Sequence, residues 1–122
     1  MLLKNFYSVI SSVHSEGVYT TTLKINNTHE LYLGHFPGRP VTPGVILMQL
    51  FKEEAERVSK KDLILHTASN VKFTAVVDPN LDNHLVLKTN IEEAEGKINL
   101  RGTAENNNSI AIKIQAVYKI KN

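Results

Sequence analysis

The residues with the clearest chemical potential lie together in one short segment, 34–44, which reads GHFPGRPVTPG. It holds three of the chain's four prolines and three of its six glycines, so neither a regular helix nor a central strand can form there. The segment must be an ordered loop with a specified path. It carries His35, and an imidazole takes up and releases protons near neutral pH. His35 is therefore the first candidate for acid–base chemistry.

A helix is expected directly after this loop, over residues 43–58. Thr42 is a suitable N-cap, and Pro43 suits the first helical position because its missing N–H would have no partner there. The free N–H groups of a first turn carry the positive end of the helix dipole and point at whatever occupies the cap. Because Gly44 lacks a Cβ, a ligand can approach these groups closely, so Gly44 is a candidate for binding a polar substrate atom.

The faces of this helix are expected to differ along its length. Residues 45–48 (VILM) are apolar on every side, which predicts a first turn that is buried all round. Beyond Phe51 the helix becomes amphipathic, and its charged side chains are expected mostly in water. That expectation includes Glu53 and Glu54, the two carboxylates that follow position 49 most closely.

The remaining segments are typical of β-strands, because apolar and polar residues alternate between turn residues. A short helical turn is expected over residues 28–31, with Thr28 as its cap. One helix among five or six antiparallel strands predicts an α+β domain. A sheet wrapped around the helix and a two-layer sandwich both fit this pattern. The segments with this pattern are 6–13, 18–25, 63–66, 70–77, 84–91, 97–104 and 110–120.

The composition is that of an ordinary globular protein, and we expect residues 1–122 to form a single domain. Hydrophobic residues make up 42% and charged residues 21% of the 122 residues, and there is no cysteine. A formal net charge of +2 is too small to suggest nucleic acid as a main partner. No apolar run approaches the ~20 residues of a membrane span, and no signal peptide is recognisable. These features predict a cytoplasmic protein.

No metal site is expected either. The histidines outside the loop lack metal-ligand spacing and have no cysteine to help them, so we expect them at the surface or at strand edges. They are His14, His29, His66 and His84.

Residues 34–45 (GHFPGRPVTPGV) resemble the signature of the 3-hydroxyacyl-acyl-carrier-protein dehydratase family, G-H-F-P-G-[KR]-P-x-x-P-G-V followed by a helix. A second match begins at Val71-Lys72-Phe73 and continues with Val77 and Pro79, and it is similar to the family's V-[KR]-F strand and the turn after it. The turn at 106–108 and the final strand stand where that family has its closing hairpin. The resemblance covers nearly the whole chain.

The resemblance implies a hot-dog fold, in which an antiparallel sheet wraps around one long central helix. It implies a homodimer with its active sites at the subunit interface, and assemblies of such dimers. The implied partner is an acyl carrier protein whose phosphopantetheine arm carries a 3-hydroxyacyl chain. Loss of water gives a trans-2-enoyl thioester. No metal or bound organic cofactor is implied.

The resemblance also assigns roles to individual residues. His35 matches the base that takes the α-proton, while the backbone amides at Gly44 and Phe36, with Val45 beside them, would bind the thioester carbonyl. Met48, Val45 and Phe73 are candidates for the wall of an acyl tunnel.

One position departs from the family. Fourteen residues after the histidine, where the family has an acid that protonates the leaving hydroxyl, this chain has Gln49. An amide can hydrogen-bond that hydroxyl but cannot give up a proton at neutral pH. Losing a general acid typically costs ~10²–10⁴-fold in rate.

Three functions stay open at this point. The first is a dehydratase-like lyase, which the intact loop around His35 favours. The second is a catalytically weakened acyl-binding subunit or the partner subunit of a heteromeric dehydratase, which Gln49 favours. The third is thioester hydrolysis, which normally also needs a carboxylate on the helix. Lys60, Lys61 and Arg39 could meet the acidic surface of a carrier protein, although such charges are usually just solvated.

Overall fold

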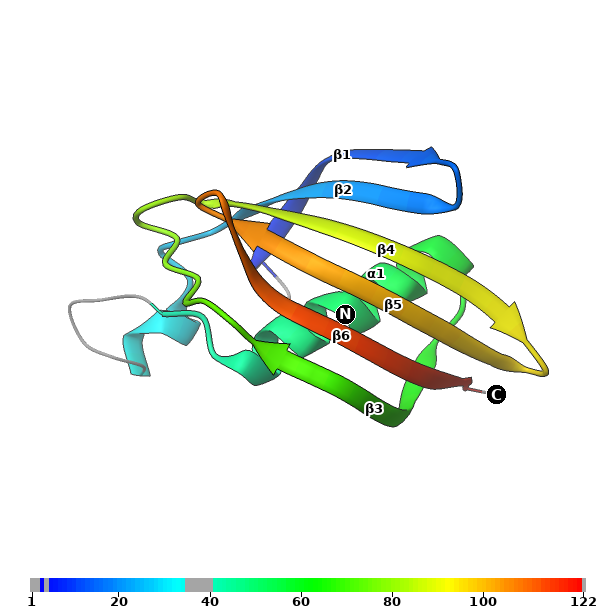
Figure 1. The fold of residues 1–122 in the computed structure, drawn as a ribbon. Helices are drawn as coiled ribbons and strands as arrows, with labels where there is room; N and C mark the ends of the chain where they lie inside the picture. Colours follow the sequence, from blue (N-terminus) through cyan, green and yellow to red (C-terminus); the bar gives the residue numbers. More distant parts are fainter. Residues whose placement is uncertain (1–2, 4, 35–40, 122) are drawn as a thin grey trace.

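The computed structural model describes residues 3, 5–34 and 41–121, which form one helix, one 3-10 turn and a six-stranded antiparallel sheet. The strand order is β1-β2-β4-β5-β6-β3, so β1 and β3 are the two edges. Figure 1 looks onto the sheet with α1 behind it. The elements are β1 (Tyr7–Ser15), β2 (Val18–Ile25), η1 (Glu30–Gly34), α1 (Gly44–Ser59), β3 (Leu63–Phe73), β4 (His84–Ala94), β5 (Lys97–Asn106) and β6 (Ser109–Ile120).

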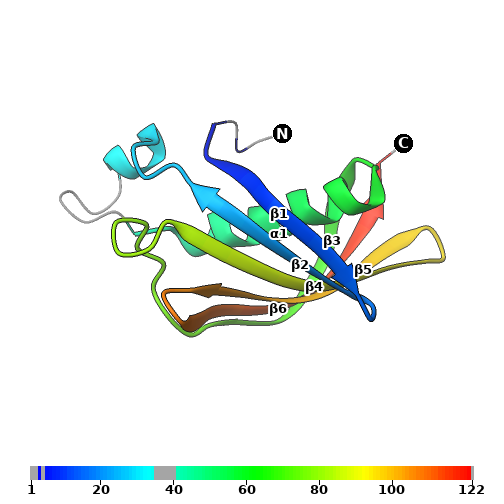
Figure 2. The same cartoon turned by 90° about the horizontal axis from the view of Figure 1, so that it is seen from above.

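The sheet curls around α1, as Figure 2 shows from above. Phe51 and Leu50 of the helix are at most 1% exposed and belong to one cluster with Leu85, Leu87 and Ile112 of the strands. Burial of these apolar side chains provides the main driving force for placing the helix against the sheet. Of the two architectures left open by the sequence, the wrapped sheet is confirmed.

Strand β3 differs most from its prediction. The segment 63–66 and residues 70–73 belong to one strand, and the predicted residues 74–77 lie beyond its end at Phe73. The pairing of β3 with β6 shifts between Ser69 and Lys72. Asn70 has a φ of 52° within this irregular stretch. The shift interrupts the alternation of side chains, which is why the sequence pattern suggested two strands.

The cap of α1 was predicted wrongly. The helix begins at Gly44, with Pro43 in the cap position and no side-chain hydrogen bond to its first turn. The hydroxyl of Thr42 instead lies 2.9 Å from the hydroxyl of Tyr32, and its N–H donates to the carbonyl of Val77 at 3.0 Å. Thr42 is buried and joins η1 and the chain after β3 to the helix start.

The first turn of α1 is not buried all round as predicted. Leu47 is 3% exposed, but Val45 is 72% exposed. Val45 lies beside β3, whose side chains are also largely exposed, including Ile64, Leu65 and Phe73. Within the described part of the chain, nothing covers this side of the helix start.

The short turn and the four histidines complete the comparison with expectation. The turn is η1, two residues later than predicted, and Nδ1 of His29 rather than Thr28 accepts a hydrogen bond from its backbone, at Leu31. His14, His66 and His84 are exposed as predicted, while His29 is partly buried against Phe6.

Candidate functional site

The two loop residues with proposed chemical roles, His35 and Phe36, lie outside the described residues. The described flanks are Gly34, where η1 ends, and Val41, just before α1. The site is therefore built from the helix start and the strands beside it.

Gly44 is in close contact with β3. A Cβ at this position would lie 2.7 Å from the ring of Phe73, so glycine lets the strand and the helix start approach each other. Ile46 and Leu47 both donate to the carbonyl of Pro43, and the N–H groups of Gly44 and Val45 precede these bonds. Gly44 thus has a packing role. Its N–H also stands at the positive end of the helix dipole, where it can donate a hydrogen bond to an anionic oxygen.

A pocket of about 190 Å³ opens between α1 and the strands next to it. Gln49, Val45 and Met48 all line it, so the structure brings three of the predicted site residues together. Phe73 does not line this pocket, and its ring lies against Gly44. The remaining lining residues are Lys52, Leu65, Ile114 and Tyr118. Burial raises the pKa of Tyr118, with the charge of Glu56 adding to the effect, so its phenol stays neutral.

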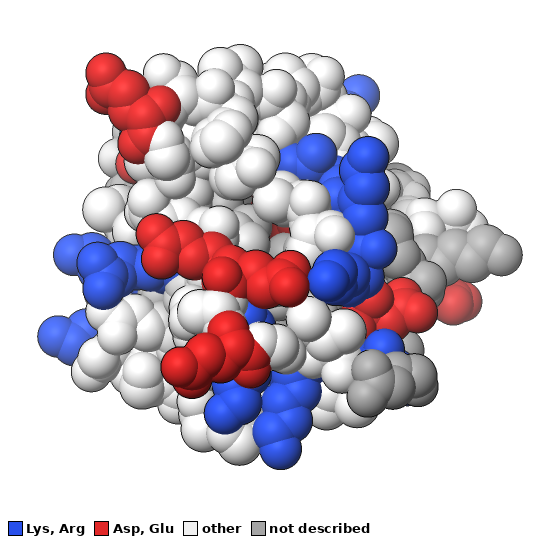
Figure 3. Space-filling view, turned by 90° about the vertical axis from the view of Figure 1, so that its right-hand side faces the viewer, with Lys and Arg blue, Asp and Glu red and all other residues white. Residues whose placement is uncertain are grey.

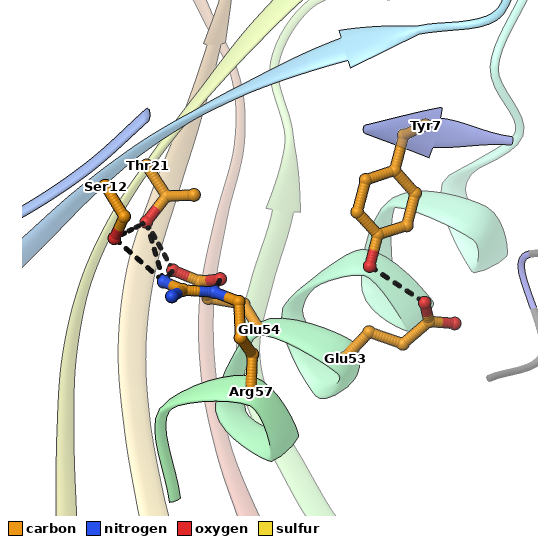
Figure 4. Close-up of polar contacts among 6 residues, drawn as sticks. All are labelled: Tyr7, Ser12, Thr21, Glu53, Glu54 and Arg57. Carbon is orange, nitrogen blue, oxygen red and sulfur yellow. Dashed lines mark hydrogen bonds and ion pairs between the residues drawn. The ribbon is translucent and has the colours of Figure 1, made fainter. Parts of the chain in front are cut away.

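The prediction that Glu53 lies on a solvated helix face is wrong. Its side chain is buried, at 2% exposed. Its carboxylate accepts hydrogen bonds from Nε2 of Gln49 at 3.1 Å, from the hydroxyl of Tyr7 at 2.9 Å and from the N–H of Leu3 at 3.1 Å. Figure 4 shows the contact with Tyr7. A carboxylate only accepts, so the amide nitrogen of Gln49 must face Glu53.

Glu54 is also buried, at 4% exposed, and this corrects the second half of the same prediction. Arg57 donates to both of its oxygens, at 2.8 and 2.9 Å, and Thr21 of β2 donates to it as well. Arg57 also reaches Ser12 of β1 (Figure 4). The β1–β2 hairpin therefore covers the helix face that the charge pattern placed in water.

The two carboxylates differ in how their charge is compensated. Hydrogen bonding to Glu54 raises the pKa of Arg57, as expected for a tight ion pair. Among the described side chains, no lysine or arginine pairs with Glu53, which is held by neutral donors alone. Burial raises the pKa of Tyr7, and the adjacent Glu53 raises it further. A buried carboxylate without a cation is costly, and such groups concentrate at functional sites.

The sequence placed Glu53 on the same helix face as Gln49, because it follows Gln49 by four residues, but the charge pattern assigned its carboxylate to water. What the sequence could not supply was the hairpin that shields this face from water.

Within the described residues, no group of three or more His, Asp or Glu side chains is placed to hold a metal ion. In that same part of the chain, no helix is long and apolar enough to cross a membrane.

Comparisons with known proteins agree with this architecture. The sequence pattern of the ApeI-like family, ApeI dehydratase, matches residues 11–113. The 3-hydroxyacyl-[acyl-carrier-protein] dehydratase FabZ of Rickettsia canadensis (strain McKiel) is 29% identical over 100 residues, covering 70% of each chain. FabZ of Wolbachia pipientis wMel is 31% identical over 68 residues, or 50% of this chain. The chain spans about half the length of that relative, 46%.

The fold is likewise similar to a solved structure, the dehydratase heterocomplex ApeI:P from Xenorhabdus doucetiae. The TM-score is 0.74 at 21% identity, over 93% of this chain and 97% of that one. The fold is the hot-dog fold of dehydratases and thioesterases. Within that class, the chain belongs to the ApeI-like dehydratase family.

Proposed function

We propose that this protein binds 3-hydroxyacyl thioesters carried on the phosphopantetheine arm of an acyl carrier protein and removes water to give trans-2-enoyl thioesters. The observation that carries the proposal is the pocket between α1 and β3, which Gln49, Val45 and Met48 line. In this pocket the side-chain amide of Gln49 and the apolar side chains of Val45 and Met48 lie next to the helix start at Gly44. This combination suits a ligand with a polar head and an acyl chain. Membership of a dehydratase family supports the reaction class.

In the proposed mechanism, His35 takes the α-proton while the amides near Gly44 and Val45 bind the thioester carbonyl, which gains negative charge. The backbone amide of Phe36 would also contribute. Gln49 would hydrogen-bond the 3-hydroxyl but has no acidic proton to give. The proton that His35 has taken is then the one available to the departing hydroxyl, so that water leaves with the proton of the α-carbon. Met48 would contact the acyl chain, and Phe73 would shield the helix start.

A second candidate function is an acyl-binding or partner subunit of a heteromeric dehydratase. The observation in its favour is that Glu53 holds the Gln49 amide in place, so the acidic position is stably occupied by a neutral group. The similar structure from Xenorhabdus doucetiae is a dehydratase heterocomplex. In this alternative the protein binds the same thioester, but an active partner supplies the acid.

The proposed assembly is a homodimer joined through β3. This edge strand exposes Ile64, Leu65 and Phe73, and an exposed apolar edge is otherwise an aggregation risk. Pairing of two β3 edges would cover them. As the family resemblance implies, His35 of each subunit would then act at the site of the other subunit. Larger assemblies of such dimers belong to the same proposal. No metal or organic cofactor is proposed, and the absence of cysteine is consistent with a cytoplasmic location.

The decisive experiment is to incubate the purified protein with 3-hydroxyacyl-carrier substrates of several chain lengths and to follow enoyl formation. We expect slow turnover that His35→Ala abolishes. If His35→Ala and the parent bind the thioester equally and neither forms the enoyl product, the partner-subunit function replaces the dehydratase.

A further inference from the structure

The face of the sheet that points away from α1 carries an excess of positive charge. Side chains alternate along each strand, and those facing α1 are the buried Leu85, Leu87 and Ile98 and their neighbours. On β3, β4, β5 and β6 the opposite positions carry six cations against two carboxylates, whereas the whole chain has a net charge of only +2. Figure 1 looks onto this face. The residues are Lys72, Lys88, Lys97, Arg101, Lys113 and Lys119, with Glu92 and Glu105.

The excess is local. Figure 3 views the end of the molecule where the β1–β2 and β4–β5 hairpins turn, and acidic and basic side chains lie intermixed there. On the outer face, by contrast, a groove of about 600 Å³ is lined by Lys72, Lys88, Arg101 and Lys113, and no acidic residue of the described chain lines it. The uncharged polar residues of its lining are Asn70, Asn90, Thr103 and Gln115.

The strand register places these cations in a row. Lys72 of β3 lies directly opposite Lys113 of β6, Lys113 lies opposite Thr103 of β5, and Thr103 lies opposite Lys88 of β4. Arg101 lies two residues along β5 from Thr103, on the same face, between Asn90 and Gln115. The row therefore crosses four adjacent strands.

Such an arrangement opposes stability. Like charges directly opposite each other on neighbouring strands are destabilising. Lys88 is paired with Glu105 at 3.5 Å, but among the described residues no carboxylate pairs with Lys72, Arg101 or Lys113. Cations that repel one another and have no carboxylate partner within the protein indicate that a partner molecule supplies the opposite charge.

We propose that this groove, here called the lysine row, docks a partner protein that presents a line of carboxylates, such as an acidic helix. Three strand spacings make the row about 14 Å long, which roughly nine or ten residues of α-helix span. The N–H groups of the inner strands are engaged in the sheet, so the groove has no nest of backbone donors for a phosphate. The side-chain amides of Asn90 and Gln115 can donate and accept, as a protein surface requires. This proposal does not depend on the catalytic one.

The test uses a synthetic helical peptide with glutamates along one face and a matched peptide with glutamines. Binding to the full-length protein is followed by fluorescence anisotropy at low and at physiological salt. We expect only the glutamate peptide to bind, and its affinity to fall as salt rises, because exposed charges are screened beyond about 8–10 Å. The double variant Lys72→Gln/Lys113→Gln should weaken binding by at least ~10-fold, two charge contacts at about 0.7 kcal/mol each.

The matched control is Lys61→Gln, which removes one exposed lysine that pairs with Glu93 outside the groove. It should change the affinity less than about twofold. Equal weakening by the control would overturn the proposal, since the binding would then reflect net charge. Tighter binding of pyrophosphate or of a short DNA duplex than of the glutamate peptide would overturn it too, by showing a phosphate site.

A measurement on the unbound protein tests the like-charge argument directly. Lys113→Gln should raise the melting temperature by about 1–4 °C, because it relieves the repulsion from Lys72. An unchanged or lower melting temperature would mean that the lysines are stabilised within the molecule and would remove the reason for a partner.

Discussion

At the scale of single residues, the contact between Gln49 and Glu53 decides what the helix can contribute to chemistry. The amide nitrogen lies 3.1 Å from a carboxylate that is buried and has no cation partner among the described side chains. An uncharged residue at position 49 is therefore electrostatically favoured in this chain. A carboxylate introduced there would meet a like charge at hydrogen-bond distance.

The first prediction concerns Gln49→Glu. Two carboxyl groups this close cannot both ionise, so they share a proton and the pKa of one is raised. The protonated member supplies the missing general acid, and enoyl formation should increase at least ~10-fold, a cautious part of the general-acid contribution. Only the protonated carboxyl can act as the acid. The gain in rate should therefore be present at lower pH and be lost as the pH rises through the raised pKa. Steady-state rates measured from pH 5 to about 9 test this.

The matched variant is Gln49→Glu/Glu53→Gln, in which a neutral amide replaces the buried carboxylate. It retains an acid at position 49 without the like charge, so the alkaline loss of activity should move to lower pH. Identical pH profiles for the two variants would show that Glu53 does not act on position 49.

The site could be predicted from the sequence only for residues whose chemical type and whose spacing from one another both matched a known reaction. The motif around His35 and the spacing of Gln49 indicated which residues belong together, and the pocket lined by Gln49, Val45 and Met48 is consistent with that reading. Glu53 was assigned to water because a charge pattern cannot reveal that a hairpin far away in the chain covers it. His35 and Phe36 stay predictions.

At the scale of elements, two glycines bring the helix and the sheet into contact by different means. A Cβ at Gly44 would meet the far end of the Phe73 ring at 2.7 Å, and that ring is 53% exposed. A Cβ at Gly102 of β5 would meet Phe51 and Thr89 at 2.9 Å, and both are 0% exposed. The first neighbour can swing away, whereas the second is enclosed by the core.

The second prediction compares Gly44→Ala with Gly102→Ala. Gly102→Ala should lower the free energy of unfolding by about 1–3 kcal/mol, the usual cost of overpacking. Gly44→Ala should change it by less than about 1 kcal/mol, because alanine also favours the helix. It should nevertheless weaken thioester binding, because a methyl group then covers the helix-start amide. Urea unfolding and ligand titration of both variants test this, and a larger loss of stability for Gly44→Ala would contradict it.

The elements were predictable where the alternation of side chains was regular. The strand 18–25 was predicted with its correct bounds, and the predicted strand 84–91 lies within β4, where Leu85 and Leu87 are buried. The single strand β3 was divided in two because its register shift breaks the alternation near Asn70. The cap was misplaced because Thr42 bonds Tyr32, a contact between residues that no local pattern relates.

At the scale of the whole molecule, buried phenols make the stability sensitive to alkali. Burial raises the pKa of Tyr7, Tyr32 and Tyr118 above the ordinary value of 10.0. In the unfolded chain these groups ionise near pH 10, while the folded state keeps them protonated. Their contribution is therefore fully present below pH ~10 and is lost as the pH rises from there toward the folded-state values.

The third prediction follows from this sign. The melting temperature should fall steeply above pH ~10, and Tyr118→Phe should make that fall shallower because phenylalanine cannot ionise. Melting curves from pH 7 to about 11 test it, and the value at pH 7 reports the effect of removing the hydroxyl itself. Parallel curves for the variant and the parent would contradict this account.

The fourth prediction concerns assembly. If two β3 edges join, Leu65→Lys introduces a charge on the exposed strand and should convert the dimer to a monomer in sedimentation at micromolar concentration. Val13→Lys is the matched control, because Val13 is equally apolar, is 61% exposed and lies on the opposite edge strand β1. Dissociation by the control but not by Leu65→Lys would place the interface at β1.

The hydrogen bond from Leu3 to Glu53 couples the beginning of the chain to the pocket, since the same carboxylate oxygen also accepts from Gln49. A ligand that orders Gln49 should therefore slow hydrogen–deuterium exchange at the Leu3 amide, although the two residues are far apart in sequence. By thermodynamic linkage, if ligand binding strengthens the Leu3–Glu53 hydrogen bond, breaking that bond must weaken ligand binding by the same factor. A fusion tag placed before this segment would thus act as an allosteric perturbation, and affinities measured with and without the tag should differ.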